Sequence, residues 1–367
     1  MCPKPTIALT GANKKWGAWS RCHEETLESL RQRVMADDLE RASNALFERH
    51  RVDAFGGGFH VPDVARYLAL FAWDSGYHAL STVHLRPDWA LEELNTLYAA
   101  NTLADGLLSH QRFVPGAEEH QGMIEELFGP MFEADRTPFI DPPTASYAAA
   151  RLSLLLGPPT DPLLDRAMAH MDALATRRTV EGCCLPVVLH PFETGTEGSA
   201  IMANLVPSDL AKALQRLRDF TRSATAAQLN PEVALRSGHG IVVSIRPYAA
   251  GIYWPRKDLA DACSRRGRDH TADALAANAG RVAEDVCKWL WCPEEVIFVG
   301  FDLTGQRRLD GMGAMGLIPA AAATLVEAGL SAQVADRHVR PGTGMWGPYG
   351  FAAGVVRAET GVRDFVQ

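Results

Sequence analysis

The sequence has 367 residues, of which 47% are hydrophobic and 22% charged, the composition of a globular protein with enough apolar side chains for a large core. Its formal net charge of −8 provides no basic surface of the kind that binds nucleic acid or anionic membranes. No run approaches about 18 uninterrupted apolar residues, and the first residues lack the apolar segment of a signal peptide, so we expect neither a membrane span nor export.

Helical periodicity dominates the chain. Apolar residues recur on one face from His23 to His50, and Pro87 opens a second helix with acidic residues in its early turns. Further helices are predicted over residues 143–156, 161–176, 207–223, 257–267, 269–290, 318–329 and 347–359. Short β-branched runs bounded by glycine or proline predict strands at 185–189, 241–245 and 296–303.

The segments between these helices are long, rich in glycine and proline, and carry the unusual polar residues, as at 53–60, 112–143 and 189–200. Functional groups concentrate on loops held by a rigid scaffold. Repeated helix pairs joined by such loops favour one all-α toroid, a single domain of residues 1–367 whose loops meet at one end of a central pit.

Three early motifs carry candidate site residues. The segment FAWDSGYHAL places Trp73, Asp74 and His78 at a helix start, where a tryptophan face and a carboxylate suit a sugar ring and its hydroxyls. Equally, Asp74 could cap the helix and Trp73 could belong to the core. His110 has the simpler interpretation of a structural histidine, and Asp141, before two prolines, is either a helix cap or a substrate contact.

The segment LHPFETGTEGSA (residues 189–200) is the most informative. Glu193 and Glu197 lie on a loop with no other acidic residue, close to Phe192 and His190. Two neighbouring carboxylates can have separated pKa values, which acid/base catalysis requires. Alternatively, either carboxylate binds backbone amides of its own loop.

Two further aromatic residues, Trp254 and Trp346, are candidates for a pocket wall or for the core. The segment GMGAMG (residues 311–316) matches a dinucleotide-binding pattern, but no strand directly precedes it, which disfavours a nicotinamide enzyme. The seven cysteines contain no C-x-x-C pair. We therefore expect no metal and no cofactor, and a location in the reducing cytoplasm.

The order of the motifs resembles that of the mannosylglycerate and glucosylglycerate hydrolases, which are related to trehalase-like and processing glucosidases and share an (α/α)6 barrel. FAWDSGYHA, DGLLSH, DPP, HPFETGTEGS, FDLTG with GLIP, and WGPYG follow in the family's order from about residue 55 onward. The resemblance implies an all-α (α/α)6 barrel with a few short strands in its loops. It also implies metal-independent, inverting glycoside hydrolysis.

Carried over position by position, the resemblance implies that Trp73 and Asp74 line a sugar subsite flanked by His110. Phe192 replaces a ring-stacking tryptophan, Glu193 matches a glutamate of the same loop, and Glu197 aligns with the aspartate that is the family's general acid. The wider substrate-binding set that we predict is Trp73, His78, His110, Phe192, Glu193, Trp254 and Trp346.

The departures from the family pattern affect catalysis directly. Glu197 is one methylene longer than the family's aspartate, and Asp141 stands where the family has a glutamine. The family's general base lies in an E-Y-Y-like segment beyond the W-G-P motif, and no such segment precedes Gln367. On this comparison the base is lost or supplied by another chain, or Asp74 or Asp141 has replaced it, or the barrel performs a non-hydrolytic reaction.

The sequence therefore predicts a glycosidase-like enzyme acting on a small α-linked glycoside, with Glu197, Asp74 and Asp141 as catalytic candidates. The alternatives are a rewired barrel that catalyses isomerisation, elimination or cyclisation, and a binding protein without activity. The C-terminus predicts a barrel that lacks its closing helices. Such a barrel would expose apolar helix faces, so we also expect self-association.

Overall fold

The structure is a computed structural model, and it describes residues 37–129, 135–195, 205–238, 241–244, 246–309, 312–321, 329–340, 346–347, 350–351 and 354–355. The chain divides into two compact units, Met1–Arg49 and His50–Gln367. In the first unit, residues 37–49 are helical, which confirms the described part of the helix predicted from His23.

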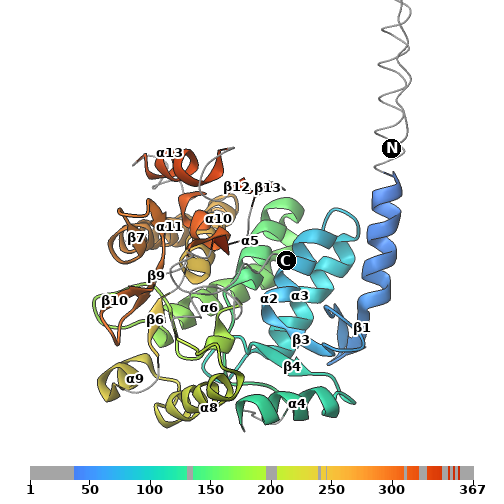
Figure 1. The fold of residues 1–367 in the computed structure, drawn as a ribbon. Helices are drawn as coiled ribbons and strands as arrows, with labels where there is room; N and C mark the ends of the chain where they lie inside the picture. Colours follow the sequence, from blue (N-terminus) through green and yellow to red (C-terminus); the bar gives the residue numbers. More distant parts are fainter. Residues whose placement is uncertain are drawn as a thin grey trace, which may run out of the picture. The chain divides into compact units, whose positions relative to one another are not determined.

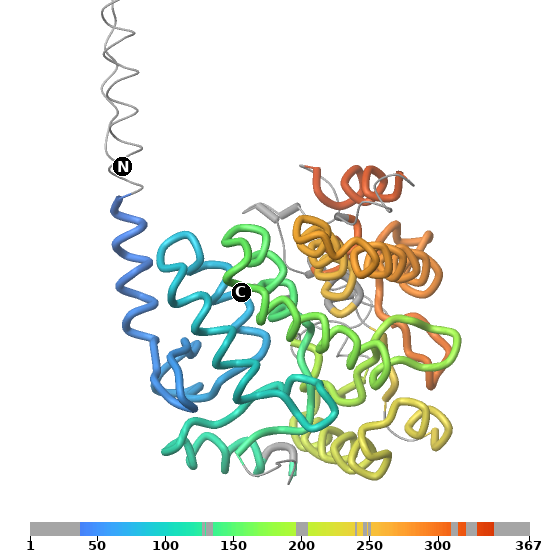
Figure 2. The backbone as a smooth tube through the Cα atoms, turned by 180° about the vertical axis from the view of Figure 1, so that it is seen from behind, coloured from blue at the N-terminus to red at the C-terminus, as the bar shows by residue number. Residues whose placement is uncertain are grey.

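Three pairs of helices form the centre of this unit (Figure 1). They are α2 (Ala72–Thr82) with α3 (Pro87–Asn101), α5 (Thr144–Leu156) with α6 (Asp161–Arg177), and α10 (Arg246–Ser264) with α11 (Asp269–Asp285). The first helix of each pair also packs against its counterparts, because α5 contacts both α2 and α10. This places α2, α5 and α10 side by side as inner helices, backed by α3, α6 and α11, as in an (α/α)6 barrel (Figures 1 and 2).

The inner helices approach closely at the start of α5. A Cβ atom on Gly76 of α2 would lie 2.6 Å from the carbonyl carbon of Thr144. On the other side, a Cβ atom on Gly251 of α10 would lie 3.0 Å from the ring of Pro143. Glycine is therefore required at position 76, and little room is left for a larger residue at position 251. The close approach fixes the position of the Asp141–Pro142–Pro143 segment that precedes α5.

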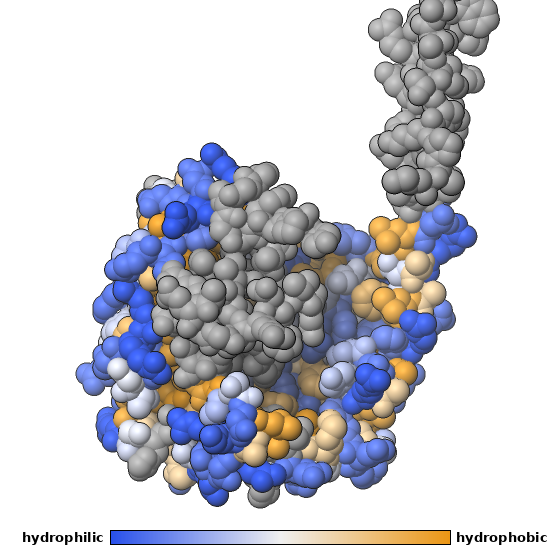
Figure 3. All heavy atoms as spheres, in the orientation of Figure 1, coloured by the Kyte–Doolittle hydropathy of each residue, from blue (hydrophilic) through white to orange (hydrophobic). Residues whose placement is uncertain are grey.

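The remaining described helices are shorter or peripheral. They are α4 (Glu118–Phe128), α8 (Leu210–Ala226), α9 (Pro231–Ser237), α13 (Leu330–Val334), the 3-10 segments at Pro158–Thr160, Pro191–Glu193 and Ala314–Ala321, and the π-helical segments at Val286–Leu290 and Ala335–Val339. The described helices include none that is long and apolar enough to cross a membrane. On the face drawn in Figure 3, hydrophilic side chains cover most of the described surface.

Each of the three segments predicted to be a strand contributes to one antiparallel sheet, although 296–303 contains two strands, of which only the second joins that sheet. Its order is β10 (Arg307–Leu309), β9 (Gly300–Asp302), β6 (Val243–Ser244) and β5 (Val187–Val188). The other pairs are β1 (Arg51–Ala54) with β2 (Gly57–His60), β3 (Ala69–Phe71) with β4 (Gln111–Phe113), β7 (Trp291–Cys292) with β8 (Ile297–Phe298), β11 (Met312–Gly313) with β14 (Gly354–Val355), and β12 (Trp346–Gly347) with β13 (Gly350–Phe351). Every strand pairing within the described residues is antiparallel, unlike the parallel sheet of a dinucleotide-binding fold.

Several predicted boundaries were wrong. The helix predicted over 347–359 is contradicted, because its described residues form strands in a stretch where glycine and proline disfavour helix. The segment 112–143, expected to be a loop, contains α4. The helix expected to start at 257 begins at Arg246 and continues through Pro255, since a proline at that position does not stop a helix held by packing against α5 and α11.

Candidate functional site

The start of α2 is held by groups from two other segments. The amide of Ala72 donates to the carbonyl of His110 (3.0 Å), and the amide of Trp73 donates to Oδ2 of Asp141 (3.0 Å). The residue that precedes α2, Phe71, offers no capping side chain of its own. Asp141 is therefore a helix cap, as one interpretation of the sequence proposed, but it caps α2 rather than the helix that follows it.

Asp141 and His110 form the next contact of the site. Asp141 is only 4% exposed, and its Oδ1 lies 3.7 Å from Nε2 of His110. Burial, with a smaller contribution from His190 and His120, lowers the pKa of His110 to about 3. The imidazole is therefore neutral at physiological pH, and its contact with Asp141 is polar rather than an ion pair.

Phe192 packs on His110, as a pocket-wall residue would. The two rings meet edge to face with centroids 4.4 Å apart. His190 fixes the position of Phe192, because its Nδ1 accepts the Phe192 amide (3.0 Å) while its ring stacks on Phe139 at 4.5 Å. The aromatic side of the site is thus built from the 189–200 loop and the irregular segment before α5.

Glu193 is buried beneath this surface. Its side chain is 0% exposed and its two oxygens accept four hydrogen bonds, from the amides of Ile140 (3.2 Å) and Leu189 (2.7 Å) and from both terminal nitrogens of Arg178 (2.7 and 3.3 Å). The bond from Leu189 is the contact with its own loop that the sequence allowed for. Through these bonds the Glu193 carboxylate joins its loop to the segment before α5 and to the residue that follows α6. The carboxylate has no access to solvent.

Asp74 and His78 belong to a second buried network, which contains two groups that the sequence analysis did not select. Nδ1 of His78 lies 3.5 Å from Oε1 of Glu93, and Nδ1 of His60 lies 2.6 Å from Oε2 of the same carboxylate. Glu93 is fully buried on α3. The sequence could have indicated this role, because Glu93 stands among Ala90, Leu94 and Leu97 on the apolar face of α3. A charged side chain on such a face is rarely left unpaired.

The pKa directions in this network follow from burial and mutual attraction. Burial disfavours the charged form of His78, but the hydrogen bond and charge of Glu93 and the charge of Asp74 outweigh it, so the pKa of His78 is raised. Burial would raise the pKa of Glu93, yet hydrogen bonds from His60 and His78 lower it. Burial raises the pKa of Asp74, with His78 opposing that change.

The 189–200 loop returns to α2 at Gly195. This residue has φ +61°, and a Cβ atom on it would lie 2.9 Å from the ring of Trp73. The backbone of the loop therefore packs directly on the tryptophan face, with Tyr77 on α2 beside the same ring at 5.6 Å. Glu197, two residues further on, lies outside the described residues.

The other predicted aromatic residues are less informative. Trp254 is half-buried on the inner helix α10, and its ring centroid lies 6.3 Å from that of Tyr147 on the inner helix α5. Trp346 belongs to β12, and its side chain is outside the described part of the chain. Among the described residues, no three His, Cys, Asp or Glu side chains are grouped as a metal site requires.

Tyr248 of α10 is a site residue that sequence reasoning missed. It is fully buried, and its hydroxyl has no hydrogen-bond partner among the described residues. Burial, followed by the charges of Glu193 and Asp141, raises its pKa. A neutral phenol beside these two carboxylates can donate a hydrogen bond, but nothing in the surrounding segment RPYAAG indicates this.

Comparison with known proteins identifies the family. The model of the mannosylglycerate hydrolase MGH1-like glycoside hydrolase domain matches residues 67–359, which include α2, α5, α10 and the 189–200 loop. The chain belongs to this family. The resemblance inferred from the motif order is thereby confirmed, and the residues described above lie within an MGH1-like domain.

Individual relatives are more distant. Mannosylglycerate hydrolase MGH1 of Selaginella moellendorffii is 28% identical over 203 residues, covering 52% of this chain and 38% of that protein. The mannosylglycerate hydrolase of Rubrobacter radiotolerans is 24% identical over 299 residues, covering 70% of this chain and 65% of that protein. The chain thus spans less than two thirds of the length of either relative.

A solved structure supports the fold. The crystal structure of the GH63 mannosylglycerate hydrolase from Thermus thermophilus in complex with glucose matches with a TM-score of 0.62 and 19% identity, over 86% of this chain and 82% of that chain. At this identity the match concerns the fold. It confirms that this MGH1-like domain has the all-α (α/α)6 barrel.

Proposed function

We propose that this MGH1-like domain hydrolyses a small α-linked glycoside, with Glu197 as the general acid. The observation that supports this proposal most is the close packing of the Gly195 backbone on the ring of Trp73. It places Gly195, the last described residue of this part of the loop, on the aromatic face at the start of α2, near Asp74. An aromatic face beside a carboxylate suits the ring and hydroxyls of a sugar, and Glu197 follows Gly195 by two residues in the sequence.

Asp74 is the better candidate for the general base. Asp141 already gives Oδ2 to the Trp73 amide and is nearly inaccessible, whereas Asp74 is half-buried. Burial also raises the pKa of Asp74, and a carboxylate of higher pKa is the stronger base. Asp141 then acts as a positioning residue that holds Trp73 through its backbone.

The proposed reaction is direct displacement with inversion. Glu197 donates its proton to the glycosidic oxygen while the bond from the anomeric carbon to that oxygen breaks. Asp74 accepts a proton from a water molecule whose oxygen attacks the anomeric carbon from the opposite face. The sugar leaves with inverted configuration and the aglycone as an alcohol, and the two carboxyl groups would stand about 6.5–9.5 Å apart.

The names of the relatives make mannosylglycerate the first substrate to test, and the resemblance in motif order adds glucosylglycerate and other small α-glycosides. Free sugar should be released by the wild type, and Glu197→Gln should reduce kcat by at least about a hundredfold. Glu284→Gln, at an exposed position of α11, is the matched control and should retain full activity. Folded wild-type protein that releases sugar from none of these glycosides would overturn the proposal.

The role of Asp74 needs a separate test. Asp74→Asn should lose hydrolysis, and azide, which attacks without a base, should restore turnover and give a glycosyl azide of inverted configuration. Asp141→Asn retains an oxygen that can accept the Trp73 amide and should keep more activity than Asp74→Asn. The reverse order of these two variants would move the base to Asp141.

A further inference from the structure

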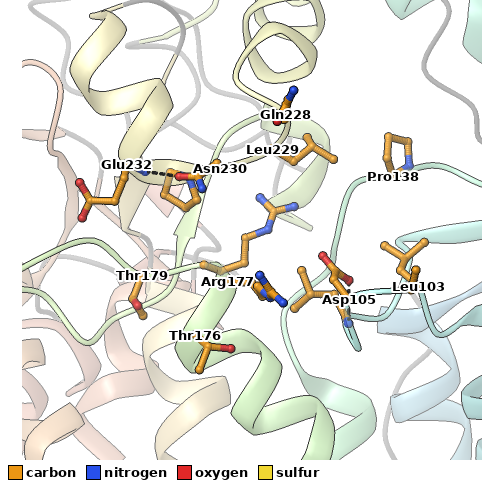
Figure 4. Close-up of a pocket in the computed structure, with 14 residues that line it drawn as sticks. Leu103, Asp105, Pro138, Thr176, Arg177, Thr179, Gln228, Leu229, Asn230 and Glu232 are labelled. Carbon is orange, nitrogen blue, oxygen red and sulfur yellow. Dashed lines mark hydrogen bonds between the residues drawn. The ribbon is translucent and has the colours of Figure 1, made fainter.

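A cavity of about 390 Å³ lies outside the candidate site (Figure 4). Its walls come from the turn after α3, the C-terminal end of α6 with the residues that follow it, and the loop that joins α8 to α9, with Pro138 on the remaining side. None of the site residues predicted from sequence lines it. Neither the general acid nor the base proposed above therefore explains its side chains.

Two guanidinium groups supply donors to this cavity. Arg177 makes no ion pair or hydrogen bond with the described residues. Arg178 is 1% exposed and binds Glu193 through its two terminal nitrogens, but its Nε is buried without a hydrogen-bond partner among the described residues. An unsatisfied buried N–H is costly, and a ligand oxygen in the cavity is one means of satisfying it.

Two carboxylates supply acceptors. Oδ1 of Asp105 accepts the Leu107 amide (3.1 Å), and Oε1 of Glu232 accepts the Glu181 amide (2.6 Å). These bonds hold both carboxylates in place. Oδ2 of Asp105 and Oε2 of Glu232 remain as acceptors for other donors, and Oε2 of Glu232 lies 3.7 Å from the exposed Arg236.

The charges in the cavity argue against an ionic ligand. Glu193 neutralises the positive charge of Arg178, and Arg236 lies 3.7 Å from Glu232, so Asp105 and the guanidinium of Arg177 remain as one negative and one positive group. This balance offers an anion no excess positive charge, and Arg177 opposes a cation. Paired donors and carboxylate acceptors are instead the arrangement that hydroxyl groups need, because each hydroxyl donates one hydrogen bond and accepts others.

The loop between α8 and α9 is strained where it forms the cavity wall. Gln228 and Leu229 have φ values of +52° and +54°, a left-handed conformation that non-glycine residues rarely adopt. Such strain is unfavourable and persists at ligand clamps more often than elsewhere. The apolar part of the wall is formed by Leu103, Leu107, Pro138, Leu229 and Pro231, which suit the C–H surface of a ring.

From this combination we propose that the cavity binds a neutral polyhydroxylated molecule, such as a mono- or disaccharide or a cyclic polyol, at a site separate from Trp73. Its hydroxyls would accept from Arg177 and from Nε of Arg178 and donate to Asp105 and Glu232. The proposal does not depend on hydrolysis, because a sugar can occupy this site in a domain that is catalytically silent.

The test is methyl NMR on protein labelled at leucine, since Leu103, Leu107 and Leu229 report on the cavity directly. The probes are methyl α-glucoside, methyl α-mannoside, trehalose and myo-inositol, with gluconate as the anionic counterpart. We expect saturable shifts of these three leucines with dissociation constants on the order of 1 mM. Asp105→Asn, which keeps the oxygen that caps Leu107, and Arg177→Gln should each weaken binding about tenfold or more.

Two controls separate this site from the proposed active site. Trp73→Ala should leave the cavity shifts unchanged while it removes any binding at α2, and Arg222→Gln, at a 71% exposed arginine outside the cavity, should change neither. Melting temperatures establish that the variants are folded. Absence of any shift at about 100 mM probe, loss of the shifts in Trp73→Ala, or tighter binding of gluconate than of every neutral probe would each overturn the proposal.

Discussion

The carboxylate of Glu93 holds two histidine rings from different elements, His60 of β2 and His78 of α2. Because His78 also faces Asp74, the protonation state of His78 affects the carboxylate that we propose as the base. A buried charge of this kind is stable only while its partners remain in place. The network therefore connects the packing of α3 with the electrostatics of the candidate site.

The raised pKa of His78 can be tested by titration. In ¹⁵N-histidine NMR, the pKa of His78 should lie above its ordinary value of 6.5. Glu93→Gln should lower this pKa, because it removes one of the two negative charges that oppose the effect of burial. A histidine of raised pKa contributes stability at low pH that is lost as pH rises through the folded-state pKa. The stability difference between wild type and Glu93→Gln should therefore shrink over that range. Glu92→Gln, next to it on α3 but paired with Arg51, should leave His78 unchanged.

The Arg178–Glu193 pair offers a second test on the scale of single residues. Arg178→Met should destabilise the fold by about 3–5 kcal/mol, because it leaves a buried carboxylate without its counter-ion. The double variant Arg178→Met/Glu193→Leu should recover much of that loss, measured by urea denaturation. A double variant as unstable as the sum of the two single variants would show that the pair is not coupled.

On the scale of secondary-structure elements, the position of the site depends on how closely α2, α5 and α10 approach. Sequence periodicity located α3, α5 and α6 well, because their apolar faces are continuous and prolines mark their starts. It missed α4, whose sequence EEHQGMIEELF contains a glycine at mid-helix, and it started a helix only after Pro255, where packing overrides the local preference. Intrinsic preferences are decisive only where tertiary contacts are weak.

The α2–α5 approach predicts an asymmetry between two glycine substitutions. Gly76→Ala should destabilise the domain by about 1–3 kcal/mol, because the new Cβ would meet backbone atoms of Thr144. Gly122→Ala, in α4 with nothing within 4 Å of the added carbon, should stabilise it by about 0.5–1 kcal/mol through higher helix propensity. Thermal and urea unfolding of both variants give the comparison, and a neutral Gly76→Ala would contradict the observed helix spacing.

On the scale of the whole molecule, the order of the motifs was sufficient to predict the family and the barrel. The site was predictable only in part. Four of the predicted residues do lie together, namely Trp73, Asp141, His110 and Phe192. They could be predicted because each stands in a motif of the family. Tyr248, Glu93 and Arg178 act through partners distant in sequence, and no local pattern identifies such partners. The sheet shows the same limit, since three separate apolar runs give no indication that they will pair.

Self-association is the prediction that belongs to this scale. A second copy could cover apolar side chains that are exposed on the described surface, such as Tyr67, Leu155 and Leu210. Light scattering at micromolar concentration should then give a mass above the 39.9 kDa of one chain. A monomeric mass that does not change with concentration would contradict this expectation.

The contact between Gly195 and Trp73 also gives the protein an optical reporter. An indole ring covered by backbone is shielded from water, and its fluorescence emission shifts when that cover moves. The chain has eight tryptophans, so the contribution of Trp73 would be isolated as the difference between the wild type and Trp73→Phe. That difference spectrum would follow, in solution and in real time, whether the segment that leads to Glu197 stays packed on α2 when a ligand arrives.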